Sequence, residues 1–363
     1  MERQNSMNKL FYNDAKETCL AINSISGKLA NSSILITGGT GMIGVQIVKT
    51  LLYLNENQNS NIKIILTIRN DAKLKYLFTK SELENLTIIQ HDFSTQKKLP
   101  DIDVDYIFHT VAVTGNSKCH VEQPVNTINT ALSSMQQLLE FARFHSIKGM
   151  IFLSSLEVYG KTDINKYDVS ENDYGYLDIL NVRSSYSESK RMCETMCVAY
   201  AKQYNLPIYI ARLTASFGVG TKFEDNRVFA QFARSIVLEK DIVLKSKGDT
   251  IRNYCYVSDV VSALFFIMLK GEIGQAYNIS NMNTDISIKE MAELIIEQNP
   301  TSSSKLIFDI QKDISKLGYN EMLIKRLNSE KLLQLGWKPN VNMQEMLRRL
   351  VQYMQVCKDN NEQ

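Results

Sequence analysis

The sequence predicts an α/β protein with a doubly wound parallel sheet and a smaller C-terminal lobe interleaved with it. Three observations lead to this expectation. Short apolar segments alternate with helical stretches through the first 213 residues, a glycine-rich turn joins the first apolar segment to a helix, and hydroxyl and carboxyl side chains directly follow a later apolar segment. Strands that alternate with helices build parallel sheets, and ligands bind beyond the carboxyl ends of such strands.

The apolar segments in this part of the chain are short and rich in isoleucine and leucine, as buried strands are. Six of them are predicted to be strands: 34–37, 63–68, 86–90, 106–109, 150–154 and 208–213. Helical stretches such as 131–144 separate them. The alternation predicts one sheet domain over residues 32–213.

After this domain the alternation gives way to longer loops. The elements predicted there are one strand and three helices: 276–279, 226–240, 287–298 and 342–354. We interpret residues 214–363 as mostly a smaller substrate-binding lobe, interleaved with the first domain without a clean linker. Residues 1–31 form an N-terminal helical extension.

This extension is predicted to contain one added helix, roughly residues 8–22, whose purpose the sequence leaves open. Its docking side is expected to carry four apolar residues: Leu10, Phe11, Leu20 and Ile22. Asp14 and Glu17 belong to a segment that lacks a continuous apolar run, so we expect neither a signal peptide nor a membrane anchor. We therefore expect a cytoplasmic protein without membrane contact.

Composition limits the functional classes further. With 363 residues, of which 44% are hydrophobic and 22% charged, the chain can bury a large core and form one or two domains. The net charge of +2, without a basic stripe interleaved with aromatic residues, argues against nucleic-acid binding. The six cysteines form no Cys-x-x-Cys pair and the four histidines show no ligand spacing, so we expect reduced thiols and no metal site.

A glycine motif links the first strand to the helix that follows. Gly38, Gly41 and Gly44 are spaced as Gly-x-x-Gly-x-x-Gly, with Met42 and Ile43 inside the motif. Gly38 permits the tight turn, Gly41 lets the backbone approach phosphates, and Gly44 lets helix and strand pack closely. The helix dipole favours an anion at this point. The motif therefore predicts a pyrophosphate cradle in a Rossmann-type domain.

Two further segments carry candidate catalytic side chains. One apolar strand runs into Ser155 and Glu157 at the sheet edge where ligands bind, so Ser155 can donate a hydrogen bond to a substrate oxygen. Tyr186 and Lys190 lie four residues apart on a predicted helix and share one face. A nearby ammonium and a nicotinamide ring favour the phenolate. We expect this to lower the pKa of Tyr186 and make it a usable acid or base near neutral pH.

With these three segments in place, residues from about 32 to about 350 resemble the extended short-chain dehydrogenase/reductase family, in its branch that acts on nucleotide-activated sugars. The resemblance implies that Ser155, Tyr186 and Lys190 form the catalytic triad. Tyr186 would be the general acid or base, Lys190 would bind the nicotinamide ribose, and Ser155 would orient the reacting oxygen. The resemblance also implies a homodimer.

The cofactor preference depends on the end of the second strand, where an NAD-binding chain places a carboxylate on the adenosine ribose. Here Arg69 and Asn70 follow that strand, and no carboxylate opposes a 2′-phosphate. Arg69, together with Lys73, can pair with such a phosphate, so NADP(H) is favoured over NAD(H). By the resemblance, Asp92 contacts the adenine amine, and the strand that ends at Ala112 lies beside the pyrophosphate and the ribose.

Within this branch, the sequence resembles the UDP-glucuronate decarboxylases. The segment that contains Glu157 resembles their strand-end motif, in which a glutamate joins the catalytic serine or threonine. Their active-site helix and nucleotide-binding segments resemble the sequences around Arg183, Arg227 and Arg252. The resemblance implies that these arginines bind the substrate and that Arg252 clamps its diphosphate. The alternative for Arg252 is an ordinary ion pair with a neighbouring aspartate, Asp249 or Asp259.

Three departures from the decarboxylase pattern leave the reaction open. Arg69 replaces the usual acid and favours an exchangeable NADPH, while Ala215 and Ala131 stand where the family usually has asparagines. Two chemistries follow: decarboxylation or epimerisation of a nucleotide-activated sugar, UDP-glucuronate above all, and NADPH-dependent reduction of a nucleotide-linked keto sugar or keto-polyol. A third function, that of a non-catalytic dinucleotide-sensing protein, conflicts with the presence of both Tyr186 and Lys190.

Overall fold

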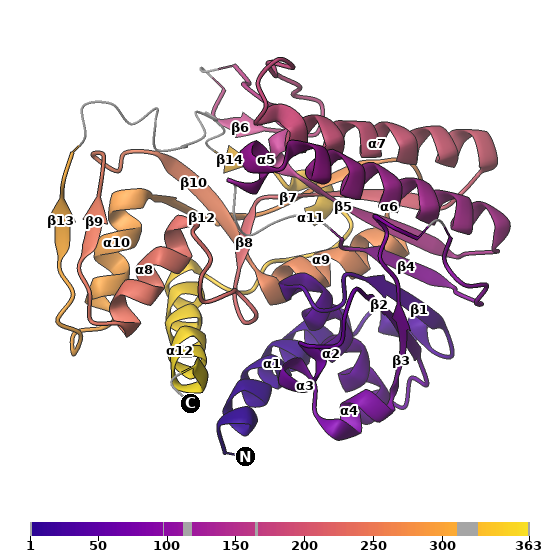
Figure 1. Cartoon of the computed structure of the whole chain (residues 1–363), viewed down its shortest axis with the longest axis horizontal. Coiled ribbons are helices and arrows are strands. Elements are labelled where there is room, and N and C mark those ends of the chain that lie inside the picture. Colours follow the sequence, from indigo (N-terminus) through magenta and orange to yellow (C-terminus); the bar gives the residue numbers. More distant parts are fainter. Residues whose placement is uncertain (1, 97, 112–117, 164–165, 311–325, 362–363) are drawn as a thin grey trace.

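The structure, a computed structural model, describes residues 2–96, 98–111, 118–163, 166–310 and 326–361 (Figure 1). Ala112, which we expected beside the cofactor, lies outside the described residues. A parallel sheet with the strand order β11-β7-β5-β4-β1-β2-β3 forms the centre of the larger lobe. Its seven strands are β1 (Ser33–Thr37), β2 (Lys63–Ile68), β3 (Leu86–Gln90), β4 (Tyr106–His109), β5 (Gly149–Ser155), β7 (Ile208–Leu213) and β11 (Ala276–Ile279).

All six strands predicted for the first domain are present, within one residue of the expected bounds. The strand at 276–279 is also present, and it belongs to the large sheet rather than to the second lobe: β11 pairs with β7 at the sheet edge. The chain therefore leaves the sheet after β7, builds part of the second lobe, and returns to complete the sheet.

Helices cover both faces of this sheet, as the doubly wound prediction requires. They are α2 (Met42–Gln58), α6 (Pro124–Phe144), α7 (Ser184–Tyr204) and α9 (Val257–Lys270), and α1 (Glu2–Ala21) packs on α2 and α9. Side chains alternate between the faces along each strand: Ile34 and Ile36 enter the core shared with α1, α2 and α9, whereas Leu35 enters the core shared with α6 and α7. Because both faces are covered, the strands are apolar throughout.

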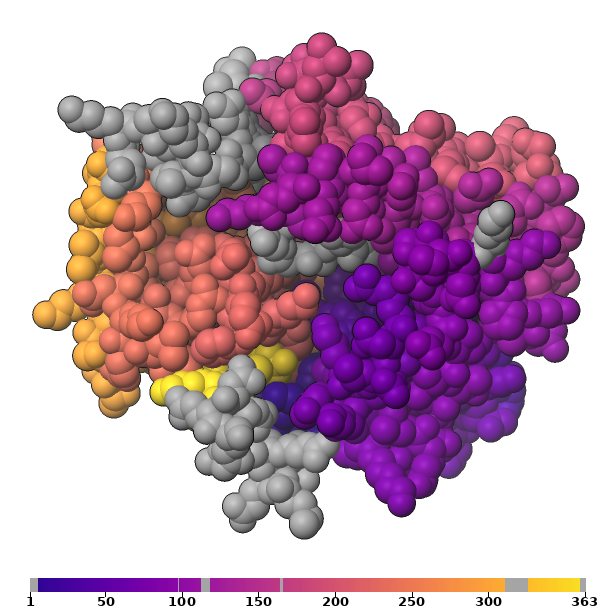
Figure 2. All heavy atoms as spheres, viewed as in Figure 1, coloured from indigo at the N-terminus to yellow at the C-terminus, as the bar shows by residue number. Residues whose placement is uncertain are grey.

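The second lobe has its own sheets, helices and hydrophobic core. Its main elements are β8 (Ala215–Phe217), α8 (Val228–Val237), β9 (Ile242–Leu244), β10 (Ile251–Tyr256), β12 (Asn281–Ser287), α10 (Ile288–Glu297), β13 (Leu306–Phe308) and α12 (Met343–Asn361). In the space-filling view this orange lobe lies beside the indigo and purple sheet domain, with α12 in yellow below it (Figure 2).

Short elements complete the described chain. They are η1 (Ser26–Leu29), α3 (Leu74–Leu77), α4 (Lys80–Glu84), α5 (Cys119–Glu122), η2 (Leu156–Tyr159), β6 (Asp168–Val169), β14 (Arg326–Leu327) and α11 (Glu330–Leu333). Among the helices that the structure describes, none combines the length and the apolar character that crossing a membrane requires.

The N-terminal helix is longer than predicted, and one of its expected docking residues was wrong. Phe11 and Ile22 are fully buried, but Leu20 is 68% exposed. The buried side follows the helical spacing of Phe11, Ala15, Cys19 and Ile22. At 100° per residue, Leu20 lies on the opposite side of the helix from Phe11. Leu10, at the edge of the buried side, is half-buried against the same core.

This helix connects the two lobes. It packs on α2 and α9 of the sheet domain and on α12 of the second lobe. The buried carboxylate of Asp14 accepts hydrogen bonds from Tyr256, at the end of β10, at 2.9 Å and from Arg349, on α12, at 3.1 Å. Arg349 also forms a bidentate pair with Glu17, at 2.6 and 2.8 Å. The extension thus fixes the position of the second lobe against the sheet.

Candidate active site

The glycine turn after β1 has the tight geometry that the sequence predicts. Gly38 has a φ of +74°, in the left-handed region, and a Cβ there would lie 2.9 Å from the Thr110 hydroxyl oxygen. A Cβ on Gly44 would lie 2.4 Å from the Gly38 carbonyl oxygen, so a larger residue does not fit without a backbone shift. Met42 and Ile43 open α2, and the N–H groups of a first helical turn lack intrahelical partners. This cradle suits a pyrophosphate.

Two features border the cradle. Gly41 is the N-cap of α2, and a Cβ there would lie 3.4 Å from the Gly38 carbonyl oxygen; its role in the approach of phosphates stays a prediction. From the second lobe, a Cβ on Gly220 would lie 3.3 Å from the Met42 Cα atom, and the Thr221 hydroxyl is 3.3 Å from the Met42 sulfur. The loop between β8 and α8 therefore lies against the first residue of α2.

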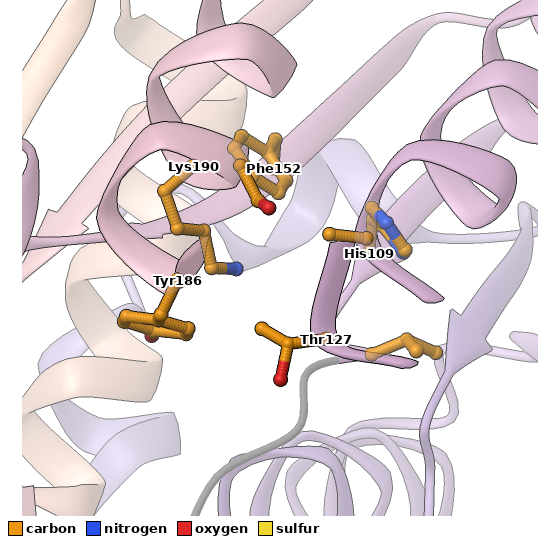
Figure 3. A pocket seen from close by; sticks show the side chains of 8 residues that line it. His109, Thr127, Phe152, Tyr186 and Lys190 are labelled. Atoms are coloured by element: carbon orange, nitrogen blue, oxygen red, sulfur yellow. The ribbon is translucent and has the colours of Figure 1, made fainter. Parts of the chain in front are cut away.

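A pocket opens at the carboxyl ends of β4 and β5, between α6 and α7 (Figure 3). Its lining residues are His109, Val111, Thr127, Ala131, Phe152, Tyr186, Ser189 and Lys190. The predicted Tyr186 and Lys190 thus line one pocket, opposite His109 and Thr127. In Figure 3 the Lys190 side chain extends into the space between Tyr186 and Thr127.

Lys190 is buried beneath this pocket. Its ammonium nitrogen donates a hydrogen bond to the Leu153 carbonyl oxygen at 2.7 Å and lies 4.6 Å from the centre of the Phe152 ring. It is 5.9 Å from the centre of the Tyr186 ring. Burial lowers the pKa of Lys190 to about 8, because a charged ammonium is poorly solvated there.

The pKa of Tyr186 moves in the opposite direction to the one expected. The pKa of Tyr186 is raised to about 12, mainly by burial and in smaller part by the nearby Glu157 carboxylate. A hydrogen bond with Ser155 and the positive charges of Arg183 and Arg227 act to lower it, but they do not outweigh burial. The prediction that the neighbouring ammonium lowers this pKa is therefore wrong for the chain by itself, because desolvation of the phenolate dominates.

Glu157 is held by Arg183, the N-cap residue of α7, and by Ser187 within that helix. Arg183 donates to its two carboxylate oxygens at 2.9 and 2.7 Å, and the Ser187 hydroxyl donates at 3.0 Å. The Ser155 hydroxyl oxygen accepts the Glu157 backbone N–H at 3.2 Å and caps η2. Ser155, Glu157 and Tyr186 are therefore brought together as predicted, whereas the guanidinium of Arg183 is engaged by Glu157.

His120, which the sequence did not point to, packs against Tyr186 at this site. The imidazole stacks on the Tyr186 ring, with ring centres 4.5 Å apart and an angle of 27° between the planes. His120 lies on the short helix α5, 66 residues before Tyr186 in the chain. Because a single histidine without a spaced partner carries no local signal, only the tertiary fold could reveal this contact.

The other two arginines predicted to bind substrate differ in their surroundings. Arg227 forms an ion pair with Asp225 at 2.6 Å, next to α8. Arg252, half-buried on β10, makes no ion pair with any described residue, so it pairs with neither Asp249 nor Asp259. Asp259 accepts the backbone N–H groups of Asn340 and Val341 at 2.9 and 3.0 Å.

Positive charges gather at the end of β2. Arg69 follows β2 directly, and the pKa of Lys73 is lowered by partial burial and by the positive charges of Lys222 and Arg69. Lys222 comes from the second-lobe loop that touches Met42, and the sequence analysis did not include it. After β3, Asp92 accepts two hydrogen bonds from Ser94, which lower its pKa, with a smaller contribution from Arg69.

Behind the site, a buried ion pair joins α7 to β7. Arg212 donates to Glu194 at 2.7 Å, and the Ser154 hydroxyl donates to the same carboxylate at 2.6 Å. Arg212 also donates to the hydroxyl oxygens of Tyr159 and Tyr174, at 3.0 and 2.6 Å. This network fixes the helix that carries Tyr186 against the strand beside β5.

The six cysteines are free thiols in the structure. Within the described ranges, no group of three histidine, cysteine or acidic side chains is arranged to hold a metal ion.

The chain is similar to known proteins over most of its length. The model of the NAD dependent epimerase/dehydratase family matches residues 34–280. The chain is 29% identical over 321 residues to UDP-glucuronic acid decarboxylase 5 of Arabidopsis thaliana, and the alignment covers 88% of each protein. This similarity extends over both lobes.

Solved structures share the fold at lower identity. The UDP-glucuronic acid 4-epimerase of Bacillus cereus, in complex with UDP-glucuronic acid and NAD, has 21% identity and a TM-score of 0.71, and the match covers 89% of this chain and 98% of that one. RMD from Pseudomonas aeruginosa, complexed with NADPH, has 19% identity and a TM-score of 0.68, with 90% and 99% covered.

Proposed function

We propose a function from one premise: this chain belongs to the NAD dependent epimerase/dehydratase family. We infer that it transfers hydride between a nicotinamide dinucleotide and a sugar carried by a nucleotide, with Tyr186 as the acid or base. The observation that carries the proposal is that Tyr186 and Lys190 line one pocket at the ends of β4 and β5, while Ser155 forms a hydrogen bond with Tyr186.

The residues of the cradle fit a dinucleotide. Side chains at Gly38 and Gly44 would fill the space beside the first turn of α2, where free N–H groups favour an anion. When bound there, a nicotinamide dinucleotide supplies a carbon that accepts or releases hydride. We propose that Lys190 holds the nicotinamide ribose. This role suits a buried ammonium that lines the same pocket.

The remaining steps belong to the side chains. For oxidation of a sugar hydroxyl, the Ser155 hydroxyl orients the substrate oxygen and the Tyr186 phenolate takes its proton. For reduction, the Tyr186 phenol returns the proton to the carbonyl oxygen. The Arg252 guanidinium binds the substrate diphosphate, because its planar fork of donors can form two parallel hydrogen bonds to a phosphate.

For the reaction itself, we propose decarboxylation or epimerisation of UDP-glucuronate. The similarity to a UDP-glucuronic acid decarboxylase over most of both chains supports this choice. So does Glu157, which the chain keeps at the strand-end position and holds with Arg183 and Ser187. Oxidation at C4 gives a β-keto acid, which loses carbon dioxide readily, and the returned hydride completes a pentose.

A second candidate, the NADPH-dependent reduction of a nucleotide-linked keto sugar or keto-polyol, is favoured by the cations at the end of β2. Arg69, Lys73 and Lys222 form a basic group at the end of β2 that would suit the 2′-phosphate of NADPH. We propose NADP(H) as the preferred cofactor on this ground. Arg69→Ala should weaken NADPH binding without weakening NADH binding, as measured by nicotinamide fluorescence. Equal weakening of both would contradict the preference.

One experiment separates the two reactions. The purified protein is incubated with UDP-glucuronate and either NAD or NADP, and separately with NADPH and nucleotide-linked keto substrates, while absorbance at 340 nm and released carbon dioxide are followed. Carbon dioxide without net cofactor change identifies the decarboxylase. Stoichiometric loss of NADPH without carbon dioxide identifies the reductase. Dinucleotide binding without turnover on any substrate would leave the sensing protein as the remaining function.

We also propose a homodimer formed through α6 and α7. Apolar side chains are exposed on this helix pair: Val125 and Ile128 on α6, and Met192 and Val198 on α7. Helical spacing places Val125 and Ile128 on one side of α6, whereas Met192 and Val198 lie about 120° apart around α7. Val125→Asp combined with Met192→Asp should convert a dimer into a monomer in light scattering. The free thiols support a reducing compartment, so we propose the cytoplasm.

A further inference from the structure

The phenol of Tyr186 has an aromatic neighbour that the proposed chemistry does not use. The His120 imidazole covers one face of the ring at 4.5 Å between ring centres, nearly parallel to it. His120 itself is buried, with 5% of its surface exposed. Offset aromatic stacking at this distance is favourable and restricts the ring that it covers. The contact therefore fixes the plane of the Tyr186 phenol.

The imidazole is fixed in turn from two helices. Its Nδ1 atom lies 3.2 Å from the Thr127 hydroxyl oxygen, on α6. The His120 carbonyl oxygen accepts the Ser185 hydroxyl, on α7, at 3.0 Å. Because α5 has only four residues, these tertiary contacts hold His120 more firmly than its own helix can.

Several charged or titratable groups face this imidazole. Burial lowers the pKa of His120, the Arg183 guanidinium lowers it further, and the Glu157 carboxylate acts in the opposite direction. Cys119 lies beside it, with its sulfur 3.8 Å from Nδ1. A histidine whose pKa lies below its usual value is neutral at physiological pH. It therefore packs against Tyr186 as a neutral ring and adds no charge to the site.

We propose that His120 is a positioning residue for Tyr186: its stacked ring keeps the phenolic oxygen within hydrogen-bond reach of Ser155 and of the reacting substrate oxygen. This inference rests on the proposed function. Tyr186 reaches its position through rotatable side-chain bonds, and proton transfer requires a separation close to that of a hydrogen bond. Removal of the covering ring lets the phenol move by a rotamer, and a misplacement of about 1 Å costs on the order of 10²-fold in rate.

Three variants separate stacking from hydrogen bonding at position 120. His120→Phe keeps a flat ring without the nitrogen near Thr127, His120→Asn keeps a polar group without the ring, and His120→Ala removes both. We expect His120→Ala and His120→Asn to lower kcat by about 10- to 100-fold with little change in dinucleotide affinity. His120→Phe should restore kcat to within about threefold of the wild type.

A matched control is available elsewhere on the chain. His145 also stacks on an aromatic residue, Phe141, at 3.8 Å between ring centres, but it pairs with Asp101 rather than facing the pocket. His145→Ala should leave kcat unchanged. Wild-type kcat in His120→Ala, or full activity in His120→Asn with loss in His120→Phe, would overturn the proposed role of the stack.

A second measurement needs no turnover and therefore separates this inference from the proposed function. The measurement is the NMR spectrum of protein with labelled tyrosine rings. Of its 17 tyrosine signals, the one that disappears in Tyr186→Phe belongs to Tyr186. A stacked imidazole shifts this signal by its ring current, so His120→Ala should move it and His120→Phe should move it less. An unchanged Tyr186 signal in His120→Ala would refute the stack even if no nucleotide sugar were turned over.

Discussion

Arg183 engages Glu157 through both terminal guanidinium nitrogens, at 2.9 and 2.7 Å, three residues before Tyr186. The two charges of this pair have opposite effects on the phenol: the carboxylate raises the pKa of Tyr186 and the guanidinium lowers it. The pair therefore does more than join η2 to α7. It is part of the electrostatic balance that determines the pKa of Tyr186.

The first prediction concerns this balance. Glu157→Gln removes the negative charge and leaves the positive charge of Arg183, so it should lower the pKa of Tyr186. Oxidation of a substrate hydroxyl needs the phenolate, and the acid limb of its pH profile should move to lower pH. The profile of kcat/KM against pH measures this shift. Glu188→Gln, which alters a surface pair on the same helix, is the control; a shift to higher pH in Glu157→Gln contradicts the prediction.

The second prediction separates an enzyme from a dinucleotide-sensing protein. Tyr186→Phe removes the proton-carrying oxygen and keeps the ring, so kcat should fall by about 10²- to 10⁴-fold. Dinucleotide affinity, measured by fluorescence titration, should stay within about threefold of the wild type. Tyr176→Phe changes an exposed tyrosine of the loop before α7 and should have no effect. Unchanged turnover in Tyr186→Phe would show that Tyr186 is not the catalytic acid or base.

The third prediction tests the substrate end of the site. Arg252 makes no ion pair with a described residue, and its loss should therefore weaken diphosphate binding without breaking an internal contact. A charge-assisted hydrogen bond contributes about 1.5–3 kcal/mol, so Arg252→Gln should weaken UDP binding by roughly 10- to 100-fold. Isothermal titration calorimetry measures this loss. Arg143→Gln, on the outer surface of α6, is the control and should bind UDP like the wild type.

The fourth prediction concerns the pH dependence of stability. Burial raises the pKa of Asp14 from 3.8 to about 7, although Arg349 and Tyr256 act against it. Between these two values the folded protein binds more protons than the unfolded chain, so the Asp14 contribution lowers the free energy of unfolding as pH rises from about 4 to about 7. Asp14→Asn should flatten this dependence in urea unfolding at pH 5 and pH 8. An equal change in the free energy of unfolding between the two pH values in both proteins would contradict the prediction.

The fifth prediction concerns the buried pair behind the site. Arg212→Met leaves the Glu194 carboxylate without its guanidinium partner in the protein interior. Breaking a buried pair in this way costs about 3–5 kcal/mol. Arg348→Met breaks an exposed pair with Glu345 and should cost at most about 1 kcal/mol. Urea unfolding compares the two, and equal losses would show that the Glu194 pair contributes no more than a surface pair.

Local patterns were sufficient for the sheet and for the backbone of the glycine turn. The strands are apolar throughout because helices cover both faces, and this pattern can be recognised without knowing which helices they are. Gly38 and Gly44 could also be predicted, because each glycine is required by local sterics: Gly38 by its positive φ and Gly44 by a close backbone contact. Tyr186 and Lys190 could be paired because four residues make one turn of a helix.

What the sequence could not provide depends on contacts between distant segments. The direction of the Tyr186 pKa shift is set by burial, which follows from the packing of α6 and α7 and not from the spacing to Lys190. His120 and Tyr186 are far apart in the sequence and meet only in the tertiary structure. Leu20 was placed on the wrong side of its helix because the buried stripe follows Phe11 rather than the local density of apolar residues.

The contact between α1 and α12 has a consequence for how the chain acquires its structure. The ribosome makes Asp14 and Glu17 more than 300 residues before Arg349, their shared partner. Contacts of such long sequence separation form late, since closing the loop between them costs entropy that only the assembled core can offset. The apolar side of α1 can therefore dock on the nascent sheet during synthesis, but its ion pairs can form only after the last helix has been translated.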